Sequence, residues 1–502
     1  MQYAAGFSST GTLCSPAILV GFWVTWHRDN SPRTTSIHIL DDDSLLHVFY
    51  LYRPFLLGED EEDYIRLKGG REWVRGRWWY GLSQVCQRWR NIILGSASYL
   101  DLSLVCTYGT PVADMLAHSP PLPLVLDYDT RGRGITTDDE EGIFLALKQR
   151  DRVLRVRLDT SLQRIITAMD EEYPILEYLV IKLPVEDKST ILILPETLRA
   201  PQLRHLKLRG FAIPVGSRLL TTAVGLITLY LSPVHLSTYF HPNNLLQWIS
   251  LMPKLEMLVF FSKSIIPSRD VESQLTHSPV TAPPVTHPNL HHFQFRGVGA
   301  YLEALVHRIA APRLKKLDID LFSQPTISVP RLLQFINATE NLGYDSVVFR
   351  FFEDYVSVAV YPRGADVYAL GILLDCLHLE QQVSFMIQIS SSLSRMFSTV
   401  EHLTFQHKEH IQSSEEHNQV DRTEWRRLLG PFINVRNLGI DNGLVQDLSR
   451  CLKLEDGELL SELLPELQEL SYSRSGDTGD AFTSYINARR NAGRPVALVT
   501  WS

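Results

Sequence analysis

Few residues in this sequence have the types and spacing needed for chemistry. One polar segment gathers histidine and glutamate side chains: His402, His407, His410, His417, Glu409, Glu415 and Glu416. Such side chains can bind metal ions, but the segment is typical of an exposed loop, so we expect no metal site. Gly297-Val298-Gly299 lacks the third glycine of a dinucleotide-binding turn.

The usual signatures of enzymes are missing from the 502 residues. The sequence contains no Gly-x-Ser-x-Gly, no phosphate-binding loop and no His-Glu-x-x-His. We therefore expect no catalytic residue and no cofactor, and we predict that the protein is not an enzyme.

Composition narrows the class of protein. Hydrophobic residues make up 45% and charged residues 21% of the chain, which is typical of a globular protein. The net charge of −8, with no evident basic stripe interleaved with aromatic residues, argues against a nucleic-acid partner. The five cysteines form no closely spaced pair, which disfavours disulfides and zinc sites and favours a cytosolic or nuclear protein.

The first residues include one apolar run, Ala17 to Val24. It is too short to span a bilayer, and no basic residue precedes it, as one would in a secretory signal. A cleaved signal remains an alternative, but we expect a poorly packed leader and no membrane association.

Two stretches have the apolar spacing of short amphipathic helices. In the first, Leu45, Val48, Phe49 and Tyr52 follow one another at i, i+3, i+4 and i+7. The second stretch, Trp78 to Asn91 with Ile93 beyond it, has the same helical period. Its apolar residues are Leu82, Val85, Cys86, Trp89 and Ile93. Two such helices are too small to enclose a core, so the rest of the chain or a partner must complete them.

Together these stretches resemble an F-box, the docking motif for the Skp adaptor. The family pattern is Leu-Pro-x-Glu-x-Leu-x-x-Ile-Phe followed by Val-Cys-x-x-Trp. The matching residues are Leu40, Asp43, Leu45, Val48, Phe49, Val85, Cys86 and Trp89. Asp41 stands in place of the proline, although acidic residues suit a helix N-terminus.

The spacing between the two halves also departs from the family. About thirty residues separate them, against roughly ten in the compact form. This insert contains Glu59 to Asp63 and Lys68 to Arg71, and we predict a solvated loop. The resemblance implies that the Skp adaptor contacts Leu40, Leu45, Leu46, Val48, Phe49, Leu82, Val85, Cys86 and Trp89. The alternative is an ordinary helical hairpin buried in its own domain.

The rest of the chain is dominated by a repeated row, apolar-x-x-apolar-x-apolar. The rows begin at Val153, Leu176, Leu203, Leu226, Leu255, Leu290, Leu314, Val400, Val435 and Leu467. Six rows have a proline two places before the first apolar residue, at Pro174, Pro201, Pro253, Pro288, Pro312 and Pro465. Helical patterns lie between rows, so we interpret each unit as a helix, a proline that stops it and a short strand.

These units resemble leucine-rich repeats in an irregular form. The asparagine of the regular repeat is missing, with Phe211, Phe322 and Gly443 at its place. The 86 residues between the rows at Leu314 and Val400 allow two interpretations. They could hold further rows, Tyr344/Val347/Phe349 and Val367/Leu370/Ile372. They could equally form an antiparallel meander of residues 347–352, 355–361 and 367–373.

We therefore predict an α/β protein in which a small N-terminal helical F-box precedes an irregular leucine-rich-repeat-like solenoid, or horseshoe. The expected segments are a leader (1–35), the F-box with its acidic insert (36–95), a linker or N-terminal cap (96–150), the solenoid (151–480) and a C-terminal cap of one helix and one strand (481–502).

The resemblance implies a substrate-recognition adaptor, similar to those of the large F-box families of mushroom-forming fungi. It would dock on the Skp adaptor and present a protein substrate to a cullin-RING ubiquitin ligase of the SCF type. Three alternatives remain: an F-box protein that delivers nothing for ubiquitination, a repeat scaffold that does not bind the Skp adaptor, and an enzyme of an unrecognised kind.

Overall fold

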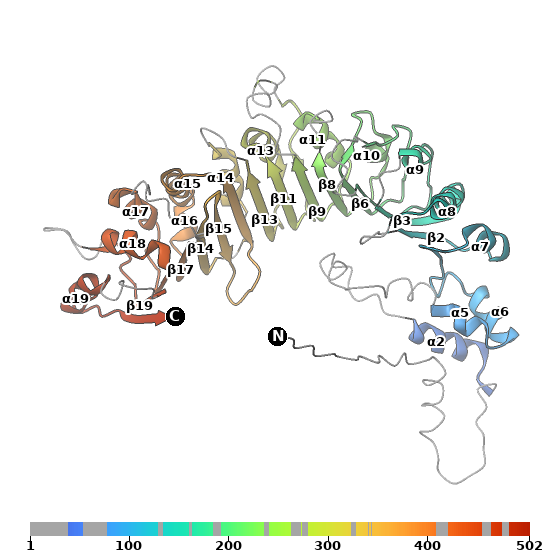
Figure 1. Ribbon diagram of the computed structural model, residues 1–502, viewed down its shortest axis with the longest axis horizontal. Helices are drawn as coiled ribbons and strands as arrows, with labels where there is room; N and C mark the ends of the chain where they lie inside the picture. The colour runs from blue at the N-terminus through green and yellow to red at the C-terminus, as the bar shows by residue number, and fades with distance from the viewer. Residues whose placement is uncertain are drawn as a thin grey trace, which may run out of the picture. The chain divides into compact units, whose positions relative to one another are not determined.

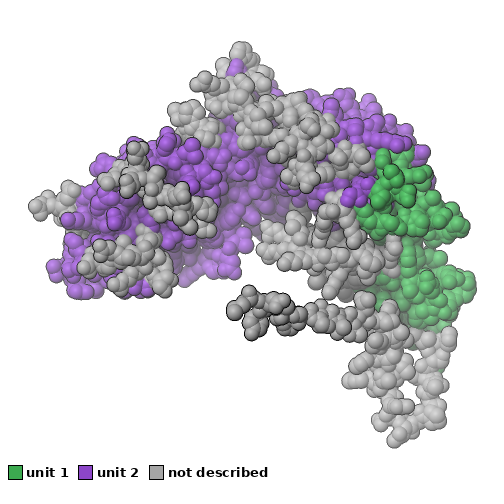
Figure 2. Space-filling view, in the orientation of Figure 1, with its two compact units in different colours: residues 1–127, 136–146 green, residues 128–135, 147–502 purple. Residues whose placement is uncertain are grey.

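The computed structural model describes residues 39–53, 78–128, 134–159, 163–183, 192–234, 240–262, 273, 280–322, 328–339, 341–342, 344–407, 420–453, 463–473 and 481–501. The predicted leader and the predicted loop with Glu59 to Asp63 and Lys68 to Arg71 lie outside these residues. The chain forms two compact units (Figure 2). Unit 1 comprises the described residues up to Asp127 together with Thr136–Ala146, and unit 2 comprises Tyr128–Ile135 and Leu147–Ser502.

In its described residues, unit 1 contains three helices, followed by two short parallel strands that alternate with two further helices. In chain order these are α2 (Asp42–Tyr52), α5 (Trp78–Ser83), α6 (Gln87–Gly95), β1 (Leu104–Cys106), α7 (Val112–His118), β2 (Leu124–Tyr128) and α8 (Thr137–Leu147). The predicted first helix is confirmed as α2. Its N-terminus carries Asp41 as the N-cap and Asp42 and Asp43 in the first turn, where carboxylates interact favourably with the helix dipole.

The predicted second helix is wrong as a single element. The chain leaves α5 after Ser83 through a turn in which the Val85 N–H donates to the Leu82 carbonyl (3.2 Å). Cys86 is extended (φ −159°) and is the N-cap residue of α6. The break has a local reason, since Gly81 and Ser83 are poor helix formers.

Unit 2 is a long, mostly parallel β-sheet with helices along one face (Figure 1). In order of hydrogen-bonded neighbours its strands are β3 (Val153–Asp159), β4 (Tyr178–Lys182), β6 (His205–Arg209), β8 (Thr228–Val234), β9 (Met257–Ser262), β11 (His292–Gly297), β13 (Lys316–Leu321), β16 (Leu370–Asp375), β15 (Tyr355–Tyr361), β14 (Ser346–Phe351), β17 (His402–His407), β18 (Asn437–Ile440), β19 (Glu469–Ser473) and β20 (Ala497–Trp501).

The helices of unit 2 connect successive strands. They are α9 (Gln163–Thr167), α10 (Arg218–Thr222), α11 (Pro242–Ser250), α13 (Gly299–Val306), α14 (Pro330–Asn337), α15 (Leu379–Ser392), α16 (Ser394–Phe397), α17 (Arg422–Leu429), α18 (Val445–Leu452) and α19 (Thr483–Asn491). The described residues also form two short strand pairs outside the main sheet. They are β5 (Leu192–Ile193) with β7 (Phe211–Ala212), and β10 (Val285–Thr286) with β12 (Ile309–Ala310). The predicted closing helix and strand are present as α19 and β20.

The repeated rows align residue for residue across the sheet. Leu206 lies beside Leu179 on one side and Leu229 on the other, and Leu208 beside Ile181 and Leu231. The same two positions of the row stay in register through Phe293 and Phe295 of β11. These side chains are fully or almost fully buried, because alternate residues of a strand point to the same face and here that face lies under the helices. The fold is thus mixed α/β, consistent with a solenoid of stacked repeats.

Each row proline lies in a turn before its strand rather than at a helix end. The N–H of the first apolar residue donates to the carbonyl three residues earlier, as from Leu255 to Met252 and from Leu314 to Ala311 (both 3.1 Å). Proline is therefore the second residue of a β-turn, a position that its fixed φ favours. Helix α11 has already ended at Ser250, three residues before Pro253, so the interpretation of these prolines as helix stops needs correction.

The long gap between rows contains both predicted patterns at once. Strands β14, β15 and β16 form an antiparallel meander. Its outer strands are parallel to their neighbours, with Leu370 beside Leu317 and Val347 beside Leu403. The meander therefore interrupts the helix–strand alternation without disturbing the register of the buried rows.

Candidate protein-interaction sites

The residues of the F-box-like pattern divide into a buried and an exposed set. Leu45, Phe49 and Trp89 are 0%, 1% and 6% exposed. The rings of Phe49 and Trp89 meet edge to face with centroids 4.9 Å apart, a favoured aromatic geometry. These three residues therefore hold α2 against α6.

The exposed set places apolar side chains at the surface of unit 1. Leu40, Val48 and Val85 are 38%, 46% and 59% exposed. The remaining predicted contact residues, Leu46, Leu82 and Cys86, are half-buried. Leu51 (57% exposed) was not predicted, yet it lies three positions after Val48 on the same side of α2.

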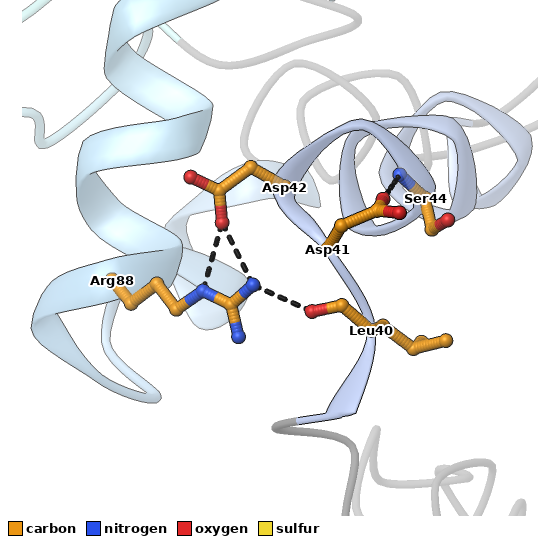
Figure 3. Close-up of polar contacts among 5 residues, drawn as sticks. All are labelled: Leu40, Asp41, Asp42, Ser44 and Arg88. Atoms are coloured by element: carbon orange, nitrogen blue, oxygen red, sulfur yellow. Dashed lines mark hydrogen bonds and ion pairs between the residues drawn. The ribbon is translucent and has the colours of Figure 1, made fainter.

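Polar contacts fasten the start of α2 to α6 (Figure 3). The Arg88 guanidinium binds the Asp42 carboxylate (2.8 Å) and also donates to the Leu40 carbonyl. At the same end, the Ser44 N–H donates to the Asp41 carboxylate (2.6 Å) and lowers the pKa of Asp41, because the hydrogen bond favours the charged form. Leu40 is thus held at the base of α2.

Unit 2 has a second candidate site, which we call the open face. It is the face of the sheet opposite the helices (Figure 1), and none of the helices described for unit 2 lies on it. Its side chains alternate with the buried rows, as Arg155 and Arg157 do around Val156. Folding brings together here side chains that are tens of residues apart in the sequence.

The middle of the open face carries a polar network. Arg296 on β11 pairs with Asp320 on β13 (3.1 Å), while Asp318 accepts hydrogen bonds from Gln294 (3.0 Å) and from the Tyr368 hydroxyl (2.8 Å). Burial raises the pKa of Asp320 to about 6; Arg296 opposes this rise and the nearby Asp375 and Asp318 add to it.

The β3 end of the open face has a feature that the sequence alone did not show. Basic and aromatic side chains do interleave there, on β3, β4, β6 and β8. The sequence showed no such stripe because its members come from different strands. Whether nucleic acid binds remains untested, and the expectation that it does not stays a prediction.

The histidine-rich segment is described only in part, since His410 and His417 lie outside the described residues. Within the described ranges, no group of three or more His, Cys, Asp or Glu side chains is arranged to hold a metal ion. Nor does any described helix combine the length and apolar character needed to cross a membrane.

Comparison with known proteins finds structural similarity but no family. No family model matches the chain, and no curated protein matches it. The crystal structure of the leucine-rich repeat-containing protein LegL7 from Legionella pneumophila is similar over 76% of this chain and 97% of that one, with 8% sequence identity and a TM-score of 0.23.

Proposed function

We propose that this protein is a substrate-recognition adaptor of the F-box type. Helices α2, α5 and α6 would dock on a Skp-type adaptor. The repeat sheet, similar to an irregular leucine-rich-repeat solenoid, would hold a protein substrate and present it to a cullin-RING ubiquitin ligase. The protein would act by proximity, because tethering a target near the charged conjugating enzyme raises its effective concentration.

The observation that carries this proposal is the exposure of apolar residues within the F-box-like pattern. Leu45, Phe49 and Trp89 pack internally, whereas Val48 and Val85 remain about half exposed. Aliphatic anchors of this kind contribute to binding when a partner covers them. The exposed apolar residues Leu40, Val48 and Val85 are also positions that the F-box resemblance assigns to the contact with the Skp adaptor, so the sequence pattern and the exposure agree.

The test is co-purification of the full-length protein with the Skp adaptor of the same organism. It compares the wild type with the double variant Val48→Glu/Val85→Glu. We expect a one-to-one complex with the wild type and at least a tenfold loss of affinity with the variant. Both residues are exposed, so the fold should survive, which circular dichroism and thermal unfolding can verify. Substituting Phe49 or Trp89 instead would remove packing inside the unit and would not isolate docking.

A matched control is Val215→Glu/Val224→Glu in unit 2, where the two valines are 60% and 52% exposed. This variant makes the same chemical change outside α2, α5 and α6, and it should leave the complex with the Skp adaptor intact. Undiminished binding by Val48→Glu/Val85→Glu would contradict the assigned docking residues. If the wild type forms no complex at all, the adaptor proposal fails and a repeat scaffold without a ubiquitin-ligase role remains.

A further inference from the structure

The β3 end of the open face carries a cluster of cationic and aromatic side chains, which we call the basic–aromatic patch. Its members are Arg155, Arg157, Tyr178, Lys182, His205, Lys207, Arg209 and Tyr230. Arg209 is exposed, and the other members are half-buried. The patch contains five Lys or Arg residues, whereas the whole chain has a net charge of −8.

The strand register shows that these residues are neighbours in space. Arg155 lies beside Tyr178, which lies beside His205. Two residues further along the strands, Lys207 lies beside Tyr230, and after two more residues Lys182 lies beside Arg209. Asp159, beside Lys182, is the one carboxylate among these open-face positions of β3, β4 and β6. The local charge is therefore clearly positive.

Contacts within the patch hold four of its side chains in place. The Lys207 ammonium lies 4.1 Å from the centre of the Tyr230 ring, a cation–π contact. The Tyr178 and His205 rings are 5.9 Å apart, and His205 Nδ1 is 3.1 Å from the Thr228 hydroxyl. Side chains fixed in this way lose little conformational entropy when a ligand binds.

The chemistry of the surface changes toward β9. The Tyr230 ring packs edge to face against Phe261, with centroids 5.8 Å apart. Phe261 and Met257 of β9 are both half-buried and apolar. A ligand that lies across the strands would therefore meet cations over β3, β4 and β6 and apolar side chains over β8 and β9.

We propose that the basic–aromatic patch binds an extended acidic segment of a partner protein, with carboxylates over β3 to β6 and an apolar residue beside Tyr230 and Phe261. Five neighbouring strands at about 4.8 Å spacing span about 19 Å, the length of about six extended residues. This proposal depends on the proposed function in one respect only: under that function, the partner would be the substrate.

The charge distribution favours a peptide over nucleic acid. A nucleic-acid surface needs a long track of cations to follow the phosphates. Here the cations of the patch lie on β3, β4 and β6, and β8 and β9 carry no charged residue. The next charged part of the open face, on β11 and β13, is of mixed sign: it pairs Arg296 with Asp320 and also contains Asp318. A short acidic peptide matches both the length and the sign of the patch.

The test is fluorescence anisotropy with the full-length protein alone. The probes are a labelled Glu-Glu-Asp-Glu-Leu-Phe peptide and its neutral partner, Gln-Gln-Asn-Gln-Leu-Phe. We expect the acidic peptide to bind at least tenfold more tightly at low salt, and we expect added salt to weaken that binding. Arg157→Glu/Lys207→Glu should abolish the preference, and the milder Arg157→Gln/Lys207→Gln should reduce it.

The matched control is Arg395→Glu/Arg427→Glu, which changes the net charge equally at two exposed helical positions and should bind as the wild type does. Equal binding of the two peptides, or an undiminished preference in Arg157→Gln/Lys207→Gln, would overturn the proposal. So would tighter binding of a single-stranded RNA 12-mer than of the acidic peptide. Because no Skp adaptor is present, the result is independent of the docking test.

Discussion

At the scale of single residues, the open face holds carboxylates whose burial is only partly compensated. Asp320 pairs with Arg296, yet its Oδ1 atom is buried without a hydrogen bond. Burial also raises the pKa of the neighbouring Asp318 and Asp375. Ionised carboxylates in such places cost stability unless cations and donors satisfy them fully.

The pH dependence of stability should report this cost. A carboxyl whose pKa is raised to about 6 in the folded state stabilises the protein below about pH 4, and that contribution is lost as the pH rises through 6. Chemical denaturation of wild type and Asp320→Asn should therefore show the variant gaining about 1–2 kcal/mol relative to wild type between pH 4 and 7, after allowance for solvent screening.

The exposed Asp366 supplies the control for this measurement. The variant Asp366→Asn makes the same substitution at an exposed site and is measured over the same pH range. If the difference between Asp320→Asn and wild type did not change with pH, Asp320 would titrate as it does in the unfolded chain.

At the scale of elements, the row prolines shape turns, and this can be tested at Pro253. Replacing it with alanine should cost only about 0.4–1 kcal/mol, through greater freedom of the unfolded chain. Far-UV circular dichroism should show no added helix, because α11 already ends at Ser250. A gain of helical signal would restore the interpretation of this proline as a helix stop.

The buried side of the sheet could be predicted from the sequence and the exposed side could not. Leu206, Leu208 and their counterparts repeat a pattern along the chain. Because these residues must be buried under the helices, the pattern also determines which alternate residues of each strand face the helices. Arg157, Lys182 and Lys207 share no such pattern. They are about 25 residues apart in sequence and become a patch only when β3, β4 and β6 pair.

The F-box-like helices show the limit of periodicity as a guide. Leu82, Val85 and Trp89 fit one helical stripe, but Val85 is 59% exposed and Trp89 is 6% exposed. The chain turns at Gln84 and Val85, between α5 and α6. A rule based on spacing does not detect this turn, because the turn leaves the sequence spacing of the apolar residues unchanged. The spacing therefore found two helical stretches but not the break between α5 and α6 that leaves Val85 exposed.

At the scale of the molecule, stability should be local along the sheet of unit 2. Leu317 is fully buried between Phe293 and Leu370. Leu317→Ala should cost about 2–5 kcal/mol. Hydrogen exchange should rise most in β11, β13 and β16, because each repeat is stacked only on its neighbours.

The matched substitution Leu206→Ala, also of a fully buried leucine, should move the region of faster exchange to β4, β6 and β8. A uniform rise along the whole sheet in either variant would show that unit 2 opens as a single cooperative block.

The meander of β14, β15 and β16 also affects how the array bends. An ordinary unit adds about 5 Å at the sheet and about 8–10 Å at the helix layer, so each unit is a wedge that turns the array. The meander adds three strands with no helix between them. We therefore expect it to act as a spacer that lengthens the strand surface without adding a wedge. An odd number of strands is also required, because only then does the chain resume in its original direction and the next wedge fit.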